Sequence, residues 1–101
     1  MDAQEYVEAV LCLVERVPPG RVTTYGAVAD ALADASGRRS ARRVGTIMAR
    51  YGAAVPWHRV VNAAGRVAPC GSREALARLR EEGTPLRGDR VDLSRALWLP
   101  Q

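Results

Sequence analysis

The tripeptide Pro18-Pro19-Gly20 interrupts the apolar pattern of this chain early and constrains how its first half can fold. Between Ala3 and Val17, apolar residues recur at three- and four-residue steps, which is typical of an amphipathic helix. Two consecutive prolines end such a helix because proline lacks a backbone N–H and clashes with the preceding turn. The apolar stripe consists of Tyr6, Val7, Val10, Leu11, Leu13, Val14 and Val17. The chain therefore begins with one predicted helix.

Two short helical patterns follow, and the second of them is basic. Thr23 or Thr24 can cap a helix that continues to Leu32, where Ser36-Gly37 then breaks the pattern. Ser40 is the expected cap of the next helix. Its expected buried stripe is Val44, Ile47, Met48 and Tyr51, with Arg42, Arg43, Thr46 and Arg50 on the outer face. Two short helices joined by a compact turn predict a helix-turn-helix over residues 24–51.

The sequence period changes after Pro56. Arg59–Asn62 and Arg66–Ala68 flank the turn Ala63-Ala64-Gly65 and predict a short β-hairpin within residues 55–68, which would form a wing.

Residues 72–101 are expected to form a C-terminal helix and tail. The helix spans Ser72–Glu82, with Ser72 as its cap, Gly83 as its stop, and Ala75, Leu76 and Leu79 facing inward. Trp98 in the tail could anchor a partner or close the core, and we expect core closure.

The length of 101 residues fits one domain and is too short for two. Folding at this size buries roughly two thirds of the unfolded surface, so one apolar core suffices without metal or disulfide crosslinks. We therefore expect a single, mainly α-helical domain over residues 1–101, with a winged helix-turn-helix. The narrow helical stripes can be covered by one core, which predicts a monomer.

Arginine supplies all 15 basic residues, and with 11 acidic residues the formal net charge is +4. Residues 37–52 contain five arginines and no acid, whereas residues 1–15 contain four acids and no base. Guanidinium groups match phosphates and base edges, so this cluster favours a polyanionic partner. A solvated basic helix face is the alternative, and charge does not choose between the two.

Cysteine and histidine are too few and too scattered for a metal or disulfide framework. Cys12 lies in an apolar helical pattern and Cys70 in a Pro-Cys-Gly turn, which favours reduced, intracellular chemistry. One His with two scattered Cys does not make a zinc site, and we expect no metal and no cofactor. The sequence has no signal peptide and no apolar run of about eighteen residues, so we expect a cytoplasmic protein without membrane contact.

The segment Pro56-Trp57-His58-Arg59-Val60-Val61 concentrates the chemistry of the chain. A lone His is more often a hydrogen-bonded structural residue than a catalyst, and a Trp is more often core than platform. No Ser, Thr or Cys adjoins His58 in the sequence to act as a nucleophile. The residues alone thus indicate a basic helix-turn-helix with a polar aromatic loop.

Three ordered blocks of the chain resemble the DNA-binding domain of O6-alkylguanine-DNA alkyltransferases. The blocks are Val22-Thr23-Thr24-Tyr25-Gly26, Ala41-Arg42-Arg43-Val44-Gly45 and Val55-Pro56-Trp57-His58-Arg59-Val60-Val61. The similarity runs from about Tyr6 to Gly83, and three motifs in one order are more specific than any one of them.

Trp57 departs from the pattern of these repair enzymes. They have a cysteine before the His, and its thiolate accepts the alkyl group. Indole cannot act as that nucleophile, because its nitrogen lone pair belongs to the ring and its N–H only donates. The pattern resembles the alkyltransferase-like proteins, which implies a non-enzymatic sensor. Such a sensor flips O6-alkylguanine of double-stranded DNA into a pocket, signals to nucleotide excision repair and shields the lesion from alkyltransferases.

The resemblance also implies roles for residues of the helix-turn-helix. Tyr25 would press on the phosphate of the target nucleotide, and Arg42 would fill the gap that the flipped base leaves. Gly45 would let the DNA backbone approach closely, and Arg43 and Arg50 would belong to the same DNA surface. A helix-capping core aromatic and an ordinary phosphate contact are the alternatives for Tyr25 and Arg42.

In the loop, the resemblance implies that Trp57 forms one wall of the base pocket, with core packing as the alternative. Val60 would offer its backbone carbonyl to the base. His58 and Glu82 resemble the pair that activates the cysteine in the enzymes, and without a thiol we expect them to be structural. Arg59 would brace the segment.

The loop Ala68–Ser72 corresponds to the Gly-rich gate of the enzymes, and Pro69 would remove a backbone donor there. The segment Arg50–Val55 is shorter than the corresponding hinge and lacks its Asn. Both changes predict a wider pocket that accepts bulkier alkyl groups.

Two other functions remain open at this stage. The chain could be a sequence-specific winged-helix regulator, although no dimerisation segment is visible. It could also be an alkyltransferase that uses Cys70, although only Arg73 is near in sequence to lower the pKa of that thiol.

Overall fold

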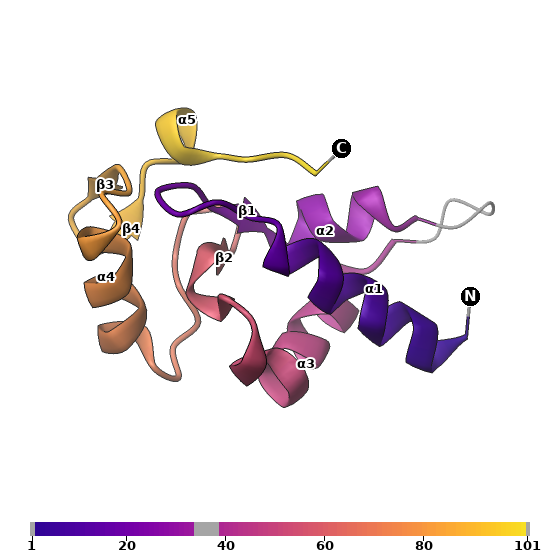
Figure 1. The fold of residues 1–101 in the computed structure, drawn as a ribbon. Helices are drawn as coiled ribbons and strands as arrows, with labels where there is room; N and C mark the ends of the chain where they lie inside the picture. Colours follow the sequence, from indigo (N-terminus) through magenta and orange to yellow (C-terminus); the bar gives the residue numbers. More distant parts are fainter. Residues whose placement is uncertain (1, 34–38, 101) are drawn as a thin grey trace.

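The computed structural model describes residues 2–33 and 39–100, and this part of the chain forms five α-helices and four short strands (Figure 1). The helices are α1 (Ala3–Glu15), α2 (Tyr25–Ala31), α3 (Ala41–Tyr51), α4 (Ser72–Glu81) and α5 (Leu93–Ala96). The strands are β1 (Thr23–Thr24), β2 (Val60–Val61), β3 (Leu86–Arg87) and β4 (Arg90–Val91), and the 3₁₀ turns are η1 (Gly52–Ala54) and η2 (Trp57–Arg59). The mainly helical fold class is confirmed. No helix within the described ranges has the length and apolar character needed to cross a membrane.

A side-chain hydrogen bond caps the start of helix α1, and a backbone hydrogen bond closes its end just before the two prolines. The Asp2 carboxylate accepts a hydrogen bond from the Glu5 N–H at 2.8 Å, which satisfies one of the free donors of the first turn. The helix ends at Glu15, before the two prolines, and the Arg16 N–H donates to the Leu13 carbonyl at 3.0 Å. Its buried face consists of Tyr6, Val10, Leu13 and Val14, as the apolar stripe predicted.

Helices α2 and α3 form the predicted helix-turn-helix, and both have the caps expected from the sequence. Thr24 Oγ1 accepts from the Ala27 N–H at 3.0 Å, and Ser40 Oγ accepts from the Arg43 N–H at 3.1 Å. The two helices pack against each other, and α1 packs against both. The break predicted at Ser36-Gly37 lies outside the described residues.

The buried stripe of α3 is one residue shorter than predicted. Val44, Ile47 and Met48 are buried, but 47% of Tyr51 is exposed. The chain turns into η1 at this point, and the buried Gly52 takes the inner position instead. A Cβ added to Gly52 would lie 3.1 Å from Met48 Cε, so there is no room for a larger residue without a shift of Met48.

The predicted hairpin at residues 59–68 is wrong. Strand β2 pairs in parallel with β1, with Thr23 opposite Val60 and Thr24 opposite Val61. Val60 and Val61 are both buried, and two consecutive apolar residues suit a strand covered on both faces better than an exposed wing. Instead of a strand, Asn62 begins a tight turn in which its Oδ1 accepts from the N–H groups of Ala64 and Arg66, each at 2.9 Å.

The antiparallel hairpin of the fold lies further along the chain. Strands β3 and β4 pair Leu86 with Val91 and Arg87 with Arg90, around the turn at Gly88. The preceding turn docks on this hairpin through Gly65, whose carbonyl accepts from the Val91 N–H at 2.8 Å. A Cβ added to Gly65 would lie 2.3 Å from the Val91 carbonyl oxygen, so this approach requires glycine.

Helix α4 ends as predicted but begins differently. The expected cap, Ser72, is already its first residue, and Gly71 precedes the helix in the left-handed conformation with φ +80°. Gly83, with φ +76°, closes the C-terminal end, where the Thr84 N–H donates to the Leu79 carbonyl at 3.0 Å. Leu79 is buried in a second cluster with Val22 and Val61, Ala75 is also buried, and Leu76 is half-buried.

The C-terminal tail lies beside β1. The Trp98 N–H donates to the Val22 carbonyl at 2.7 Å, and Arg21 Nε donates to the Ala96 carbonyl at 3.0 Å. The half-buried Trp98 packs against the cluster of α1, α2 and α3, which confirms its expected place in the core.

Candidate nucleic-acid interface

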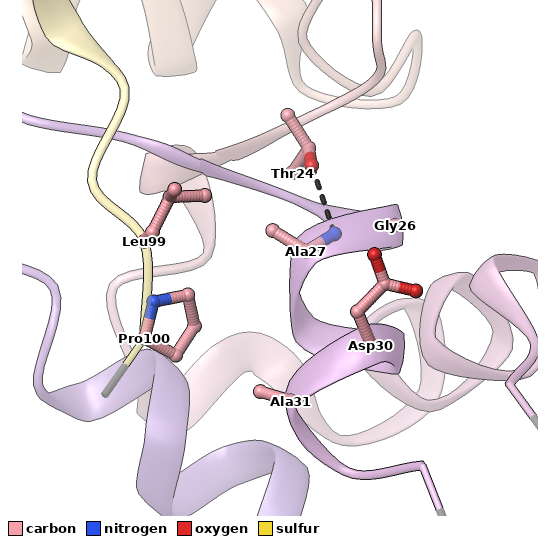
Figure 2. Close-up of a pocket in the computed structure, with 7 residues that line it drawn as sticks. All are labelled: Thr24, Gly26, Ala27, Asp30, Ala31, Leu99 and Pro100. Atoms are coloured by element: carbon pink, nitrogen blue, oxygen red, sulfur yellow. Dashed lines mark hydrogen bonds between the residues drawn. The ribbon is translucent and has the colours of Figure 1, made fainter. Parts of the chain in front are cut away.

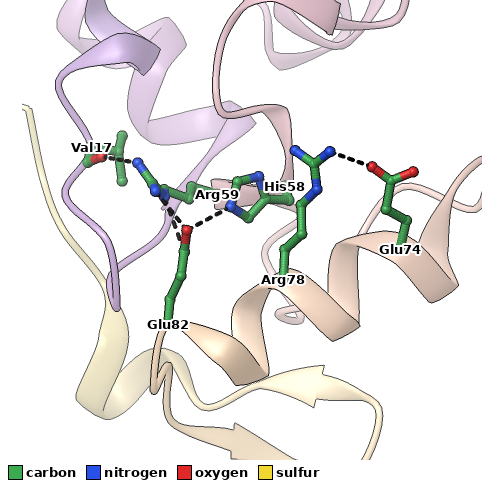
Figure 3. Close-up of polar contacts among 6 residues, drawn as sticks. All are labelled: Val17, His58, Arg59, Glu74, Arg78 and Glu82. Carbon is green, nitrogen blue, oxygen red and sulfur yellow. Dashed lines mark hydrogen bonds and ion pairs between the residues drawn. The ribbon is translucent and has the colours of Figure 1, made fainter.

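Glu82 joins the loop after Pro56 to the end of α4 (Figure 3). Its carboxylate accepts two hydrogen bonds from Arg59, from Nε at 3.1 Å and from Nη2 at 2.6 Å, and contacts His58 Nε2 at 3.0 Å. Because a carboxylate only accepts, Nε2 of His58 carries the proton of that bond. Arg59 Nη1 also donates to the Val17 carbonyl at 3.0 Å. The three charged or polar side chains thereby tie the loop to both α4 and the end of α1.

The arrangement stabilises the ionised form of Glu82. Hydrogen bonding from Arg59, together with that from His58, lowers the pKa of Glu82 to about 2, while its partial burial acts in the opposite direction. Arg59 and Glu82 are only 15% and 18% exposed, so water screens this pair less than an ordinary surface pair. This geometry supports the structural roles that the resemblance implied for His58, Arg59 and Glu82.

The lowered pKa of Glu82 predicts that the fold loses stability in acid. The carboxyl titrates near 4.5 when unfolded and near 2 when folded, so its contribution is complete above about pH 4.5. That contribution, on the order of 3 kcal/mol, is lost as the pH falls from 4.5 towards 2. Urea unfolding at pH 7 and pH 3 measures about 2 kcal/mol of this loss, because pH 3 lies between the two pKa values, with Glu82→Gln as the control because it lacks this titration. Equal pH dependence in both proteins would contradict the assignment.

Trp57 begins η2 directly beside the Glu82 cluster. Its half-buried indole meets the His58 ring edge-on, with centroids 6.1 Å apart and planes at 82°. Arg78 Cζ of α4 lies 5.6 Å from the centre of the indole. A Cβ added to Gly71 would lie 3.3 Å from Trp57 Cη2, so the predicted gate loop reaches the six-membered ring. The indole is thus bordered by residues that come from η2, the gate loop and α4.

Tyr25 and Gly45 meet where α2 and α3 pack together. Tyr25 is the first residue of α2 and is half-buried, and burial raises the pKa of its phenol. A Cβ added to Gly45 would lie 4.0 Å from Tyr25 Cδ1, which is ordinary van der Waals contact. The two residues therefore lie next to each other at this junction of α2 and α3.

The three arginines of α3 that were predicted to contact DNA have different surroundings in the structure. Arg42, Arg43 and Arg50 are exposed, but the Arg43 guanidinium lies 4.1 Å from the centre of the Tyr6 ring. This cation–π contact joins α3 to α1 and directs Arg43 towards the protein. Arg42 and Arg50 are the better placed residues of this helix for a phosphate or a groove.

The remaining candidates from the sequence are Val60 and the two cysteines. Val60 is buried in β2, next to the loop. Cys12 and Cys70 are exposed and free, and Cys70 immediately precedes the Gly71 that borders Trp57. Among the described residues, no three His, Cys, Asp or Glu side chains gather as metal ligands.

The structure also has a hollow that the sequence did not indicate (Figure 2). It lies between α2 and the C-terminal tail and has a volume of about 590 Å³. Its lining residues are Thr24, Gly26, Ala27, Asp30, Ala31, Leu99 and Pro100. It does not include the Trp57 loop, so the two features are separate.

Sequence and structure comparisons define the class of this protein. Residues 5–84 match the family described as 6-O-methylguanine DNA methyltransferase, DNA binding domain. The chain is 38% identical to the DNA base-flipping protein of Escherichia coli, over 92% of this chain and 74% of that protein. It is 32% identical to alkyltransferase-like protein 1 of Schizosaccharomyces pombe, over 99% of this chain and 100% of that protein. The chain belongs to this family of DNA-binding domains.

Solved structures narrow the class further. The crystal structure of S. pombe Atl1 in complex with damaged DNA containing O6-carboxymethylguanine matches with a TM-score of 0.80 and 31% identity. The match covers 99% of this chain and 100% of that one. A second structure of the S. pombe protein, in complex with DNA, matches equally well. Within its family, the chain is an alkyltransferase-like protein.

Proposed function

We propose that this protein is a non-enzymatic sensor of O6-alkylguanine in double-stranded DNA. One relative is named a DNA base-flipping protein, and another was crystallised with damaged DNA that contains O6-carboxymethylguanine. In this proposal the modified base leaves the duplex and is held beside Trp57. Extrusion costs less for a mispaired, alkylated guanine than for normal G·C, which favours the lesion over intact DNA.

The observation that carries the proposal is Trp57 beside an intact His58–Glu82 pair. The supporting hydrogen bonds are formed, from His58 at 3.0 Å and from Arg59 at 2.6 Å. An indole cannot accept an alkyl group as a thiolate does, so the loop holds an aromatic wall where the repair enzymes have their acceptor. We therefore propose that binding is the output of this site and that no alkyl group is transferred.

Helix α3 would supply the DNA surface of the sensor. Arg42 and Arg50 are exposed on this helix, which also contains Gly45, and Tyr25 of α2 adjoins it. If about three to five phosphates are contacted, a plot of the logarithm of the association constant against the logarithm of the salt concentration should have a slope of about −3 to −4. We further propose that the bound lesion is passed to nucleotide excision repair proteins and is shielded from alkyltransferases meanwhile.

The variant Gly45→Ala is expected to affect the stability of the fold and the affinity for DNA in different ways. An added methyl group meets Tyr25 only at 4.0 Å, and alanine is favoured over glycine within a helix by about 1 kcal/mol. We expect unchanged or higher stability in thermal unfolding. If DNA backbone approaches this face closely, the same methyl group lowers DNA affinity about tenfold, or about 1.4 kcal/mol. A stabilised variant with full affinity would show that DNA does not approach Gly45.

Binding to matched duplexes tests the proposed function. The dissociation constants for duplexes with guanine or O6-methylguanine at one position are compared at fixed salt. The proposal expects tighter binding to the modified duplex. Equal affinity would leave only a general DNA-binding domain. Selection from random duplexes then tests the regulator alternative, because an enriched consensus would favour sequence-specific recognition and contradict the sensor.

A further inference from the structure

Arg78 of α4 contacts the indole of Trp57 although it lies 21 residues further along the chain. Its guanidinium carbon is 5.6 Å from the centre of the ring, within the range of a cation–π interaction. The side chain rises from α4 towards the segment of His58 and Arg59 (Figure 3). None of the three aligned sequence blocks contains Arg78, and its role did not follow from them.

The direction of the Arg78 side chain is set by its own helix. Glu74 lies one turn earlier on α4 and accepts from Arg78 Nη2 at 2.6 Å. The neighbouring positions Ala75 and Leu79 are fully buried, so the backbone beneath Arg78 is fixed in the core. Arg78 therefore leaves α4 at the edge of the buried face, where the helix packs against η2.

Two other contacts, besides that of Arg78, restrict the indole of Trp57. Gly71 approaches the six-membered ring from the gate loop, and the His58 ring lies edge-on beside it. Gly71 and Arg78 both belong to the segment that begins with the gate loop and continues as α4. The position of Trp57 is thus determined by this segment as well as by its own loop.

We propose that Arg78 is a positioning residue for the lesion pocket, which holds the Trp57 indole through its guanidinium while Glu74 orients that guanidinium. This inference rests on the proposed function, because it assigns the indole to the pocket wall. An indole that is already fixed does not have to be ordered when the base enters, and this favours binding of the flipped base. Binding to undamaged DNA does not use the pocket and does not gain from the contact.

A simple phosphate contact by Arg78 would behave differently. It would strengthen binding to damaged and undamaged duplexes alike and add about one to the salt slope. The positioning role instead changes the ratio of the two affinities. This difference makes the proposal testable on intact protein.

The test compares Arg78→Gln, Arg78→Lys and the matched control Arg80→Gln. Arg80 is exposed on the same helix, so its replacement removes the same charge. Each variant binds duplexes with guanine or O6-methylguanine. A Trp98→Phe background makes Trp57 the single tryptophan, so that acrylamide quenching reports its accessibility. Thermal unfolding checks that each variant is folded.

We expect Arg78→Gln to lower the preference for the modified duplex by about threefold to fivefold and to increase quenching of Trp57. Arg78→Lys keeps a cation and should retain most of the duplex preference and most of the protection of Trp57 from quenching. Arg80→Gln should change neither the preference nor the quenching. Equal loss for both duplexes with a smaller salt slope would overturn the proposal in favour of a phosphate contact. An unchanged ratio and unchanged quenching would also overturn it. If the wild type shows no preference, the proposed function itself fails, which separates the two failures.

Discussion

Glu82→Ala is expected to destabilise the fold by about 3 kcal/mol, because it removes the shared partner of two poorly exposed side chains. Arg59 is 15% exposed and His58 only 5%, and both direct a nitrogen at the Glu82 carboxylate. Without the carboxylate, Arg59 keeps its positive charge in a site from which water is largely excluded. The loss is placed at the lower end of the range for broken buried pairs because Glu82 itself is 18% exposed.

Urea unfolding at pH 7 followed by circular dichroism measures this effect. Glu81→Ala is the matched control, since Glu81 is the exposed last residue of α4 and its loss should cost less than about 0.5 kcal/mol. A small domain has a total stability of about 5–15 kcal/mol, so the Glu82 variant should remain folded at low urea. A loss no larger than that of the control would contradict the role given to Glu82.

Trp57→Ala is expected to abolish most of the preference for O6-alkylguanine. Aromatic contact with a base contributes roughly 1 to 3 kcal/mol, which corresponds to a loss of about fivefold to 150-fold in affinity for the modified duplex. Affinity for the unmodified duplex should change little, because α3 and its arginines are not altered. Competition between the two duplexes at fixed salt measures both quantities.

Two further variants make the Trp57 result specific. Trp57→Phe keeps an aromatic face and should retain most of the preference. Trp98→Phe changes the other indole, which lies in the core beside α1, and should leave the preference intact. An alanine variant that is folded and still selective would show that the base does not contact Trp57.

Local features of the fold were predictable because they depend on neighbours in the sequence. The Thr24 and Ser40 caps and the Gly83 stop each follow from one residue type at a helix end. The apolar face of α1 follows from its period. The start of α4 differs from the sequence expectation because a glycine in the left-handed conformation, Gly71, precedes the helix without any side-chain cap.

Strand pairing was harder to predict because it joins distant residues. Thr23 pairs with Val60, and nothing in either two-residue strand indicates the other. The turn residues Ala63-Ala64-Gly65 favour a hairpin after Val60-Val61, whereas two adjacent apolar residues indicate a strand buried on both faces. The sequence does carry a signal for the observed hairpin, since Gly88-Asp89 is flanked by residues that alternate between apolar and charged.

The candidate site was predictable only in part, and mainly through the family resemblance. Pairing of His58 with Glu82 came from that resemblance, and the structure places them 3.0 Å apart. The contact of Arg43 with Tyr6 was not foreseen, because it depends on how α1 crosses α3. The approach of Arg78 to Trp57 likewise depends on the packing of α4 against η2, which no local pattern encodes.

In the proposed function, this protein recognises an alkylated base without reacting with it. The most direct test incubates the wild type with a duplex that contains O6-methylguanine, measures binding, and then determines the mass of the intact protein and the content of the lesion in the DNA. We expect lesion-selective binding, unchanged protein mass and an unchanged lesion. A gain of one methyl group by the protein, with loss of the lesion, would contradict it and direct attention to a thiol such as Cys70.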